Sequence, residues 1–168
     1  MAIRPIHTVP DPVLRQKAKR VKTIDKSILK LIADMKETLS AANGVGLAAP
    51  QVGVSLRVIV VSIQHEDKEK EEHCLINPEV IRRTGERTVN EGCLSIPGYV
   101  GEIVRSMQVR VKGMDETGKQ VKIVAEDLLG EALEHEIDHI NGILYVDHLE
   151  SQDKLHKLEP ETKQQTAP

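Results

Sequence analysis

The chain has 168 residues, of which 39% are hydrophobic and 29% are charged, and its formal net charge at pH 7 is −3. This length and balance are typical of one globular domain that buries its own core, and the charge gives no general attraction to polyanions. The only aromatic residues are two tyrosines, so the composition argues against base stacking and against a specific nucleic-acid partner.

No apolar run approaches the ~20 residues of a membrane span, and the N-terminus lacks the apolar stretch of a signal peptide. We therefore expect a cytoplasmic protein with no membrane partner, whose Cys74 and Cys93 stay reduced. The composition turns polar near residue 150. We expect a catalytic domain over residues 1–150 and a polar, flexible C-terminal tail over residues 151–168.

Hydrophobic periodicity predicts the elements of the first half of the chain. The first twenty residues, rich in proline, are expected to form an irregular arm. A helix is expected over residues 25–42, with Asp25 as its N-cap and Asn43-Gly44 at its end. The β-branched run at residues 56–63 predicts a buried strand, and the charged segment 65–72 predicts a loop.

Short strands are expected next in the chain. Residues 74–76 and 80–81 form two apolar pieces on either side of Asn77-Pro78. Segment 91–98 mixes glycine, cysteine, serine and proline, a composition that excludes a regular helix.

The remaining pattern predicts a hairpin followed by a buried helix. Residues 107–114 and 120–124 alternate apolar and polar side chains around a turn sequence. The helix is expected to start at Glu126 or Asp127 and to end at Gly142. This order of one helix, many short strands and one buried helix predicts an α+β fold in a single domain.

The buried helix carries an H-E-x-x-H pentad at residues 135–139. Positions i and i+4 of an α-helix lie only ~40° apart around the axis, so His135 and His139 project from one face and can bind one metal ion. Glu136 lies close enough to take a proton from a water molecule on that metal. Buried imidazoles and carboxylates are costly without partners, and a metal would satisfy them together.

A catalytic site of this kind needs a third protein ligand and an open position. The extended pattern H-E-x-x-H-x-x-G-x-x-H requires another histidine, but Tyr145 stands at that position. A downstream carboxylate, Glu159 or Glu161, lies in the polar tail beside a proline. The thiolate of Cys93, in a compact loop of small residues, is the ligand we favour, although a structural role stays open. Cys74 lies in an apolar run and is expected in the core.

Three segments together resemble the signature motifs of the peptide deformylase family, and the resemblance covers nearly the whole chain before residue 150. Glu134 stands where that family usually has an uncharged residue, but this position is outside the ligand set. The motifs are residues 44–51 (GVGLAAPQ), 91–95 (EGCLS) and 135–139 (HEIDH), and the following residues 96–98 (IPG) are similar to the bacterial type.

The resemblance implies a fold, a reaction and a cofactor. The fold is one domain of antiparallel strands around a buried metal-binding helix. The reaction is hydrolysis of the N-terminal formyl group from formyl-methionyl nascent polypeptides, with release of formate. The cofactor is one divalent metal ion, Fe(II) in the cell, with Zn, Ni or Co also accepted. The sequence does not choose among these ions.

The resemblance also implies roles for individual residues. Cys93, His135 and His139 hold the metal and leave one position for water. Glu136 is the general base that activates the water and then the general acid that protonates the departing amine.

Further roles concern the substrate. The side-chain amide of Gln51 and the backbone N–H of Leu94 are expected to stabilise the oxyanion. A peptide is expected to add as an extended strand beside Val45 and Gly46. The expected lining of the methionine pocket is Val45, Leu128 and Ala132.

Glu91 and Arg105 are expected to brace the Cys93 loop or a ligating histidine through an ion pair, with an ordinary surface pair as the alternative. Two other functions compete with the leading one. A metallopeptidase would use the same pentad. A non-catalytic binding module would need a closed four-ligand site, with His148 or Cys74 as the fourth ligand. A transient ribosome contact follows only from the nature of the substrate.

Overall fold

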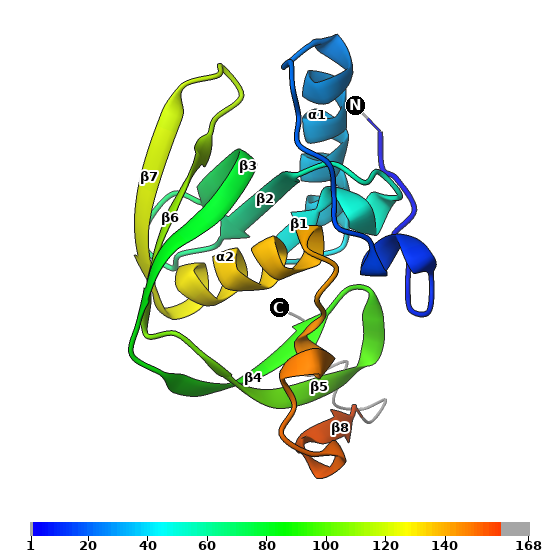
Figure 1. Cartoon of the computed structure of the whole chain (residues 1–168), viewed down its shortest axis with the longest axis vertical. Helices are drawn as coiled ribbons and strands as arrows, with labels where there is room; N and C mark the ends of the chain where they lie inside the picture. The colour runs from blue at the N-terminus through cyan, green and yellow to red at the C-terminus, as the bar shows by residue number, and fades with distance from the viewer. Residues whose placement is uncertain (1, 159–168) are drawn as a thin grey trace.

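Helix α2 (Asp127–Ile140) crosses the middle of the molecule, with the larger antiparallel sheet on one side and the smaller on the other (Figure 1). The structure, a computed structural model, describes residues 2–158. No helix in this range is long and apolar enough to span a membrane. The α+β architecture expected from the order of elements is therefore confirmed.

The larger sheet has the strand order β1-β2-β3-β6-β7, so β1 is an edge strand. The smaller sheet has the order β4-β5-β8. The strands span Gly46–Ala48 (β1), Val58–Ile63 (β2), Glu71–Thr84 (β3), Arg87–Cys93 (β4), Ile96–Arg105 (β5), Gln108–Met114 (β6), Gln120–Glu126 (β7) and Leu155–Lys157 (β8).

Strand β2 is apolar on both faces because each face meets a different helix. Ile59 and Val61 pack with Leu133 of α2 in one core cluster. Val58 and Val60 point the other way and pack against α1 (Lys26–Ala41). Since successive side chains of a strand alternate between faces, the β-branched run that predicted a buried strand has a core on each side.

Helix α1 begins as the sequence predicts. The side chain of Asp25 accepts a hydrogen bond from the backbone N–H of Ile28, which satisfies one of the free donors of the first turn. At the other end, Asn43 has a φ of 53° and ends the helix. Helix α2 likewise stops at Ile140 and is followed by Gly142 with a φ of 75°.

The expected strands between residues 71 and 105 were wrong in detail. The pieces at 74–76 and 80–81 belong to one long strand, β3, which also includes the last two residues of the expected charged loop. Its pairing with β6 is interrupted by two register shifts, one between Ile76 and Glu79 and one between Val80 and Arg82. Asn77, within the first shift, has a backbone φ of 54°. A bulge of this kind breaks the alternation of side chains, and so the sequence pattern. The hairpin β4–β5 was not predicted as a pair of strands.

Strand β8 lies inside the expected polar tail and pairs with β5, where Val100 is opposite His156. The division into a domain and a flexible tail stays a prediction. Residues 159–168, including the alternative ligands Glu159 and Glu161, lie outside the described residues.

The N-terminal arm is attached to α1 by one buried carboxylate. The side chain of Asp34 is 1% exposed and accepts hydrogen bonds from Lys30 Nζ at 3.0 Å, Arg4 Nε at 2.9 Å and the backbone N–H of Ala2 at 2.8 Å. The hydrogen bond from Lys30 is the main cause that lowers the pKa of Asp34 to about 2, while burial acts in the opposite direction.

Asp34 makes the stability of the fold depend on acid pH. Because its folded pKa lies below the ordinary value, its contribution is present above pH ~4 and is lost as the pH falls through about 2. We expect Asp34→Asn to lower the urea midpoint at pH 7, and the gap from the parent protein to narrow toward pH 3. A gap that stayed constant with pH would contradict this assignment. The exposed Glu66→Gln is the control.

Candidate metal centre

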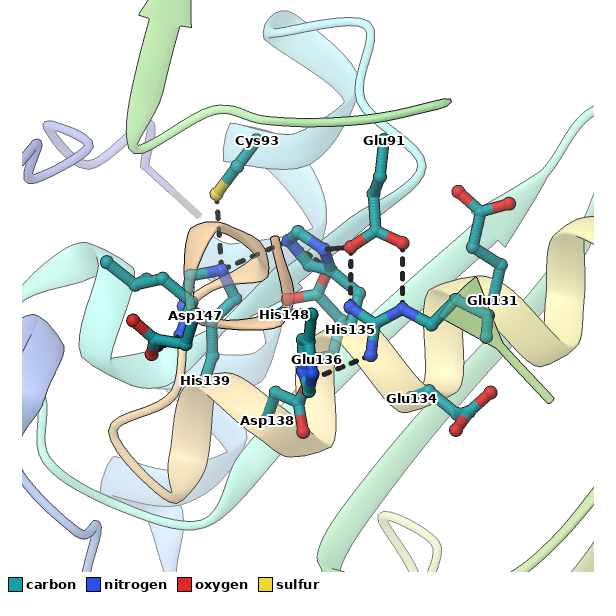
Figure 2. A network of polar contacts seen from close by, with 12 residues as sticks. Glu91, Cys93, Glu131, Glu134, His135, Glu136, Asp138, His139, Asp147 and His148 are labelled. Carbon is teal, nitrogen blue, oxygen red and sulfur yellow. Dashed lines mark hydrogen bonds and ion pairs between the residues drawn. The ribbon is translucent and has the colours of Figure 1, made fainter. Parts of the chain in front are cut away.

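Helix α2 presents both histidines of the pentad toward the smaller sheet (Figure 2). Leu133 and Ile137 occupy the opposite side of the helix and pack against the larger sheet. His135 and His139 are 8% and 1% exposed, and their Nε2 atoms lie 3.1 Å apart. The amphipathic packing of the helix thus fixes which face carries the imidazoles.

Cys93 comes from the end of β4, where the β4–β5 turn begins. Its Sγ lies 3.2 Å from His139 Nε2, and one ligand atom from each of Cys93, His135 and His139 lies within 4.8 Å of the others. Tetrahedral bonds of ~2.3 Å to sulfur and ~2.05 Å to nitrogen would separate such donors by about 3.3–3.6 Å. The three side chains can therefore hold a metal ion.

The hydrogen bonding and the pKa values of the site are also those expected where a cation binds. Oε1 of Glu136 is enclosed and has no hydrogen-bond partner within residues 2–158, a costly state for a carboxylate oxygen. Burial holds the pKa of His139 well below its usual value, which favours the neutral imidazole that a metal requires. Within the described chain, the only cluster of this kind has these three members, so neither Cys74 nor His148 closes it.

Cys74, named above as a possible fourth ligand, and Tyr145 lie in other surroundings. Burial raises the pKa of Cys74 to about 12, in keeping with a thiol of the core. Tyr145, at the position where the longer pattern requires a histidine, is 1% exposed and stacks on the ring of His135 with 6.5 Å between centroids.

A buried ionic network lies behind His135. Arg105 donates to both oxygens of Glu91, at 2.9 and 2.5 Å, and to Asp138 at 2.8 Å. Glu91 Oε2 also lies 2.5 Å from His135 Nδ1, which leaves Nε2 free for the metal. Burial alone would raise the pKa of Glu91, but the hydrogen bonds from Arg105 and His135 lower it to about 2. The expected Glu91–Arg105 pair is thus in the interior and not on the surface.

Glu136 lies beside the edge strand. Its Oε2 is 4.0 Å from His135 Nε2, and a Cβ added at Gly46 would come within 2.5 Å of that oxygen. Burial raises the pKa of Glu136 to about 7, against the opposing charge of His135. A side chain at position 46 would therefore collide with this carboxylate, and glycine leaves room for it next to the backbone.

Gln51 belongs to a short 3-10 helix, Ala49–Val52, and its side chain is fixed at both ends. Oε1 accepts from the backbone N–H of Ala48, and Nε2 lies 3.1 Å from Ser95 Oγ and 3.8 Å from Cys93 Sγ. The backbone N–H of Ser95 also donates to Cys93 Sγ at 3.4 Å. Leu94 lies between Cys93 and Ser95 in the turn.

Cys93 and His135 open into a cavity of about 420 Å³ between β1, the β4–β5 hairpin and α2, whereas His139 does not line it. Ala132 is buried at its wall, whereas Leu128 is 45% exposed. Arg105 lies behind Glu91 and does not line the cavity. The expected site residues that line it are Val45, Gly46, Gln51, Glu91, Cys93, Leu94, Leu128, Ala132, His135 and Glu136.

Several residues of the site were missed in the sequence. Asp138 joins Arg105 to His148 Nε2, which lies 2.8 Å from the same carboxylate oxygen. Glu134, which the sequence showed only as a departure from the family pattern, is buried. It accepts hydrogen bonds from the backbone N–H and the hydroxyl of Ser106. Glu131 lines the cavity. The one available signal was that a mostly buried helix carried five acidic residues, and those that are buried each needed a partner.

This fold and site define a class of protein, the H-E-x-x-H metallohydrolases with a cysteine among their ligand residues. A family model for polypeptide deformylase matches residues 3–155. The chain is 55% identical to a peptide deformylase of Dehalococcoides mccartyi, over 96% of this chain and 95% of that one. The crystal structure of peptide deformylase from Ehrlichia chaffeensis in complex with actinonin superposes with a TM-score of 0.86, at 40% identity over 92% of both chains.

A third match is the Met-Ala-Ser-bound crystal structure of a class I type b peptide deformylase from Acinetobacter baumannii. Its TM-score is 0.83 at 31% identity, over 88% of this chain and 99% of that one. The chain belongs to the polypeptide deformylase family, metal-dependent hydrolases that remove N-terminal formyl groups from nascent peptides.

Removing Arg105 tests the buried network. Arg105→Gln leaves Glu91 and Asp138 without their shared cation, and we expect the free energy of unfolding to fall by about 3–5 kcal/mol. Metal affinity, measured by competition with a chelator, should fall by about 10–100-fold because His135 loses its support. The exposed Arg110→Gln is the matched control. Equal effects of the two substitutions would mean that the network does not brace the site.

Proposed function

We propose that this chain hydrolyses the formyl amide of N-formylmethionyl peptides at a metal ion held by Cys93, His135 and His139. The observation that carries the proposal is the convergence of one sulfur and two ring nitrogens beside a buried carboxylate with a free oxygen. A divalent ion bound there supplies Lewis-acid chemistry, in that it polarises a carbonyl oxygen and lowers the pKa of water. A metallopeptidase would use the same pentad, but the chain belongs to the polypeptide deformylase family.

Glu136 is the proposed proton carrier. Its free Oε1 accepts the proton of the attacking water, and the same carboxyl then delivers it to the amine of the departing peptide. The buried setting that raises the pKa of Glu136 suits both roles, because a carboxyl that titrates near neutrality can accept and release a proton. Gly46 supports this role by letting the carboxylate approach the strand beside which the substrate would lie.

Gln51 and Leu94 are the proposed oxyanion donors. The contact of Gln51 Oε1 with the backbone of Ala48 turns Nε2 toward the sulfur side of the site, where Ser95 holds it. A donor that is already oriented needs no rearrangement as negative charge develops on the formyl oxygen. The backbone N–H of Leu94, in the turn next to Cys93, is the second donor.

The peptide is proposed to add as a strand to the free edge of β1, beside Val45 and Gly46. The first side chain then enters the cavity between Leu128 and Ala132, whose apolar surfaces suit methionine. In keeping with a methionine in the first position, the relative from Acinetobacter baumannii binds Met-Ala-Ser.

The proposed ion in the cell is Fe(II), with Zn, Ni or Co as substitutes, and the proposed location is the cytoplasm, where new chains begin. A transient contact with the ribosome follows from a nascent-chain substrate. The thiolate ligand donates charge and weakens the acidification of water relative to a site of neutral ligands, which leaves more of the proton transfer to Glu136.

Replacing the proposed base gives the first test. We expect Glu136→Ala to lower the kcat for formate release from formyl-Met-Ala-Ser by about 10²–10⁴-fold, because proton transfer loses its carrier. Metal content should be unchanged, since Glu136 is not a ligand. The exposed Glu126→Ala is the control. Turnover at the parent rate in Glu136→Ala would show that the base is another group.

The identity of the ion gives the second test. We expect protein purified without oxygen to contain about one metal ion per chain, mostly iron, and to lose formate release after treatment with a chelator. Fe(II) should restore activity to the parent but not to Cys93→Ser, whose hydroxyl is a poor ligand for a soft site. A fully zinc-filled protein that iron does not reactivate would refute the Fe(II) assignment.

A further inference from the structure

Glu131 is an acidic residue in the wall of the active-site cavity that the proposed reaction does not use. It lies one helical turn before His135 on α2, and its carboxylate is apart from the network that Glu91 forms (Figure 2). Its side chain is 17% exposed and lines the same cavity as Leu128 and Ala132. The pocket proposed for the first residue of the substrate therefore has a carboxylate beside the apolar surfaces of Leu128 and Ala132.

This carboxylate is incompletely paired. Its nearest cation, Arg87, lies 3.6 Å away, beyond hydrogen-bond distance, and the same NH2 group of Arg87 donates to the carbonyl of Asp127 at 2.7 Å. Glu131 accepts no hydrogen bond from any part of the described chain, whereas Glu91 accepts two from Arg105 alone. Carboxylate oxygens have about four acceptor sites, so Glu131 retains capacity for a donor that enters the cavity.

The surroundings of Glu131 also disfavour the ionised form of its carboxyl group. Burial, with the charge of Glu91 added to it, raises the pKa of Glu131 to about 7. A partly buried carboxylate with few donors is stabilised by any cation that reaches it. The methylene stem of such a guest would pack on the apolar wall that receives methionine.

We propose that Glu131 extends the substrate range of this enzyme to formyl peptides whose first side chain is an aliphatic stem ending in an ammonium, as in lysine. This inference rests on the proposed function, because it uses the same cavity and the same hydrolysis. Glu131 acts as a specificity-determining residue: it contacts the tip of the first side chain and takes no part in proton transfer.

The test compares three substrates that differ only in the first residue: formyl-Met-Ala-Ser, formyl-norleucyl-Ala-Ser and formyl-Lys-Ala-Ser. The measured quantity is the ratio of kcat/KM for the lysyl peptide to that for the norleucyl peptide. A loss of folded or metal-loaded protein lowers both values equally and leaves this ratio unchanged. We expect the ratio to fall about tenfold in Glu131→Gln and in Glu131→Leu.

Two further variants sharpen the result. Arg87→Gln removes the competing cation, and we expect the ratio to rise. Glu126→Gln removes a carboxylate from the exposed end of β7, and we expect no change. A ratio unaffected by both Glu131 substitutions would overturn the inference while leaving the proposed function intact. Absence of formate from formyl-Met-Ala-Ser with the parent, iron-loaded enzyme would overturn both.

Discussion

The geometry of the metal centre depends on the carboxylate of Glu91. It lies two residues before Cys93 on β4 and holds His135 of α2 through a 2.5 Å contact. The same carboxylate is fixed by Arg105 of β5. One buried group thus links the strand that supplies the sulfur to the helix that supplies the nitrogens. A metal site needs its ligands positioned to within a fraction of an ångström, and two elements that only packed together would not provide this.

Arg105 makes this arrangement energetically tolerable. Two carboxylates, Glu91 and Asp138, share its guanidinium, and the side chains of all three are no more than 11% exposed. Burying charges costs several kcal/mol per ion, and an apolar cluster of similar volume would often be more stable. Contacts with apolar side chains, however, would not fix the orientation of the His135 ring. The ionic network gives up some stability for a defined orientation of His135, with its Nδ1 engaged and its Nε2 free.

The sequence predicted the parts of this molecule that repeat with a regular period. Helix α1, the buried run in β2 and the pentad helix all follow from hydrophobic spacing or cap residues. Strand β3 was divided into pieces because its bulge at Asn77 interrupts the alternation, and the β4–β5 hairpin was missed because glycine and proline occur within it. The irregularity arises from tertiary pairing, which a local pattern does not record.

The candidate site was predictable to a different extent. The spacing of His135 and His139 is a local property of a helix, so chemistry alone predicted two ligands. The third ligand left alternatives, since Cys93 is close to the helix only through the folding of a separate sheet. The chemistry of its loop already favoured Cys93, and the family resemblance strengthened that prediction. Asp138, Glu131 and Ser95 were missed because their roles depend on partners far away in the sequence. A buried acidic residue signals that a partner exists without saying which one.

The three proposed ligand residues are held in unequal ways. Glu91 orients His135, and the backbone N–H of Ser95 supports the Cys93 sulfur. His139 Nδ1 has no hydrogen-bond partner within residues 2–158, so on this side the ring, which is 1% exposed, is held only by packing. Hydrogen bonds thus orient Cys93 and His135 at the junction of the two sheets. Packing is enough for His139 because the last turn of α2 lies against the main core, where Ile137 and Ile140 prevent the helix from turning.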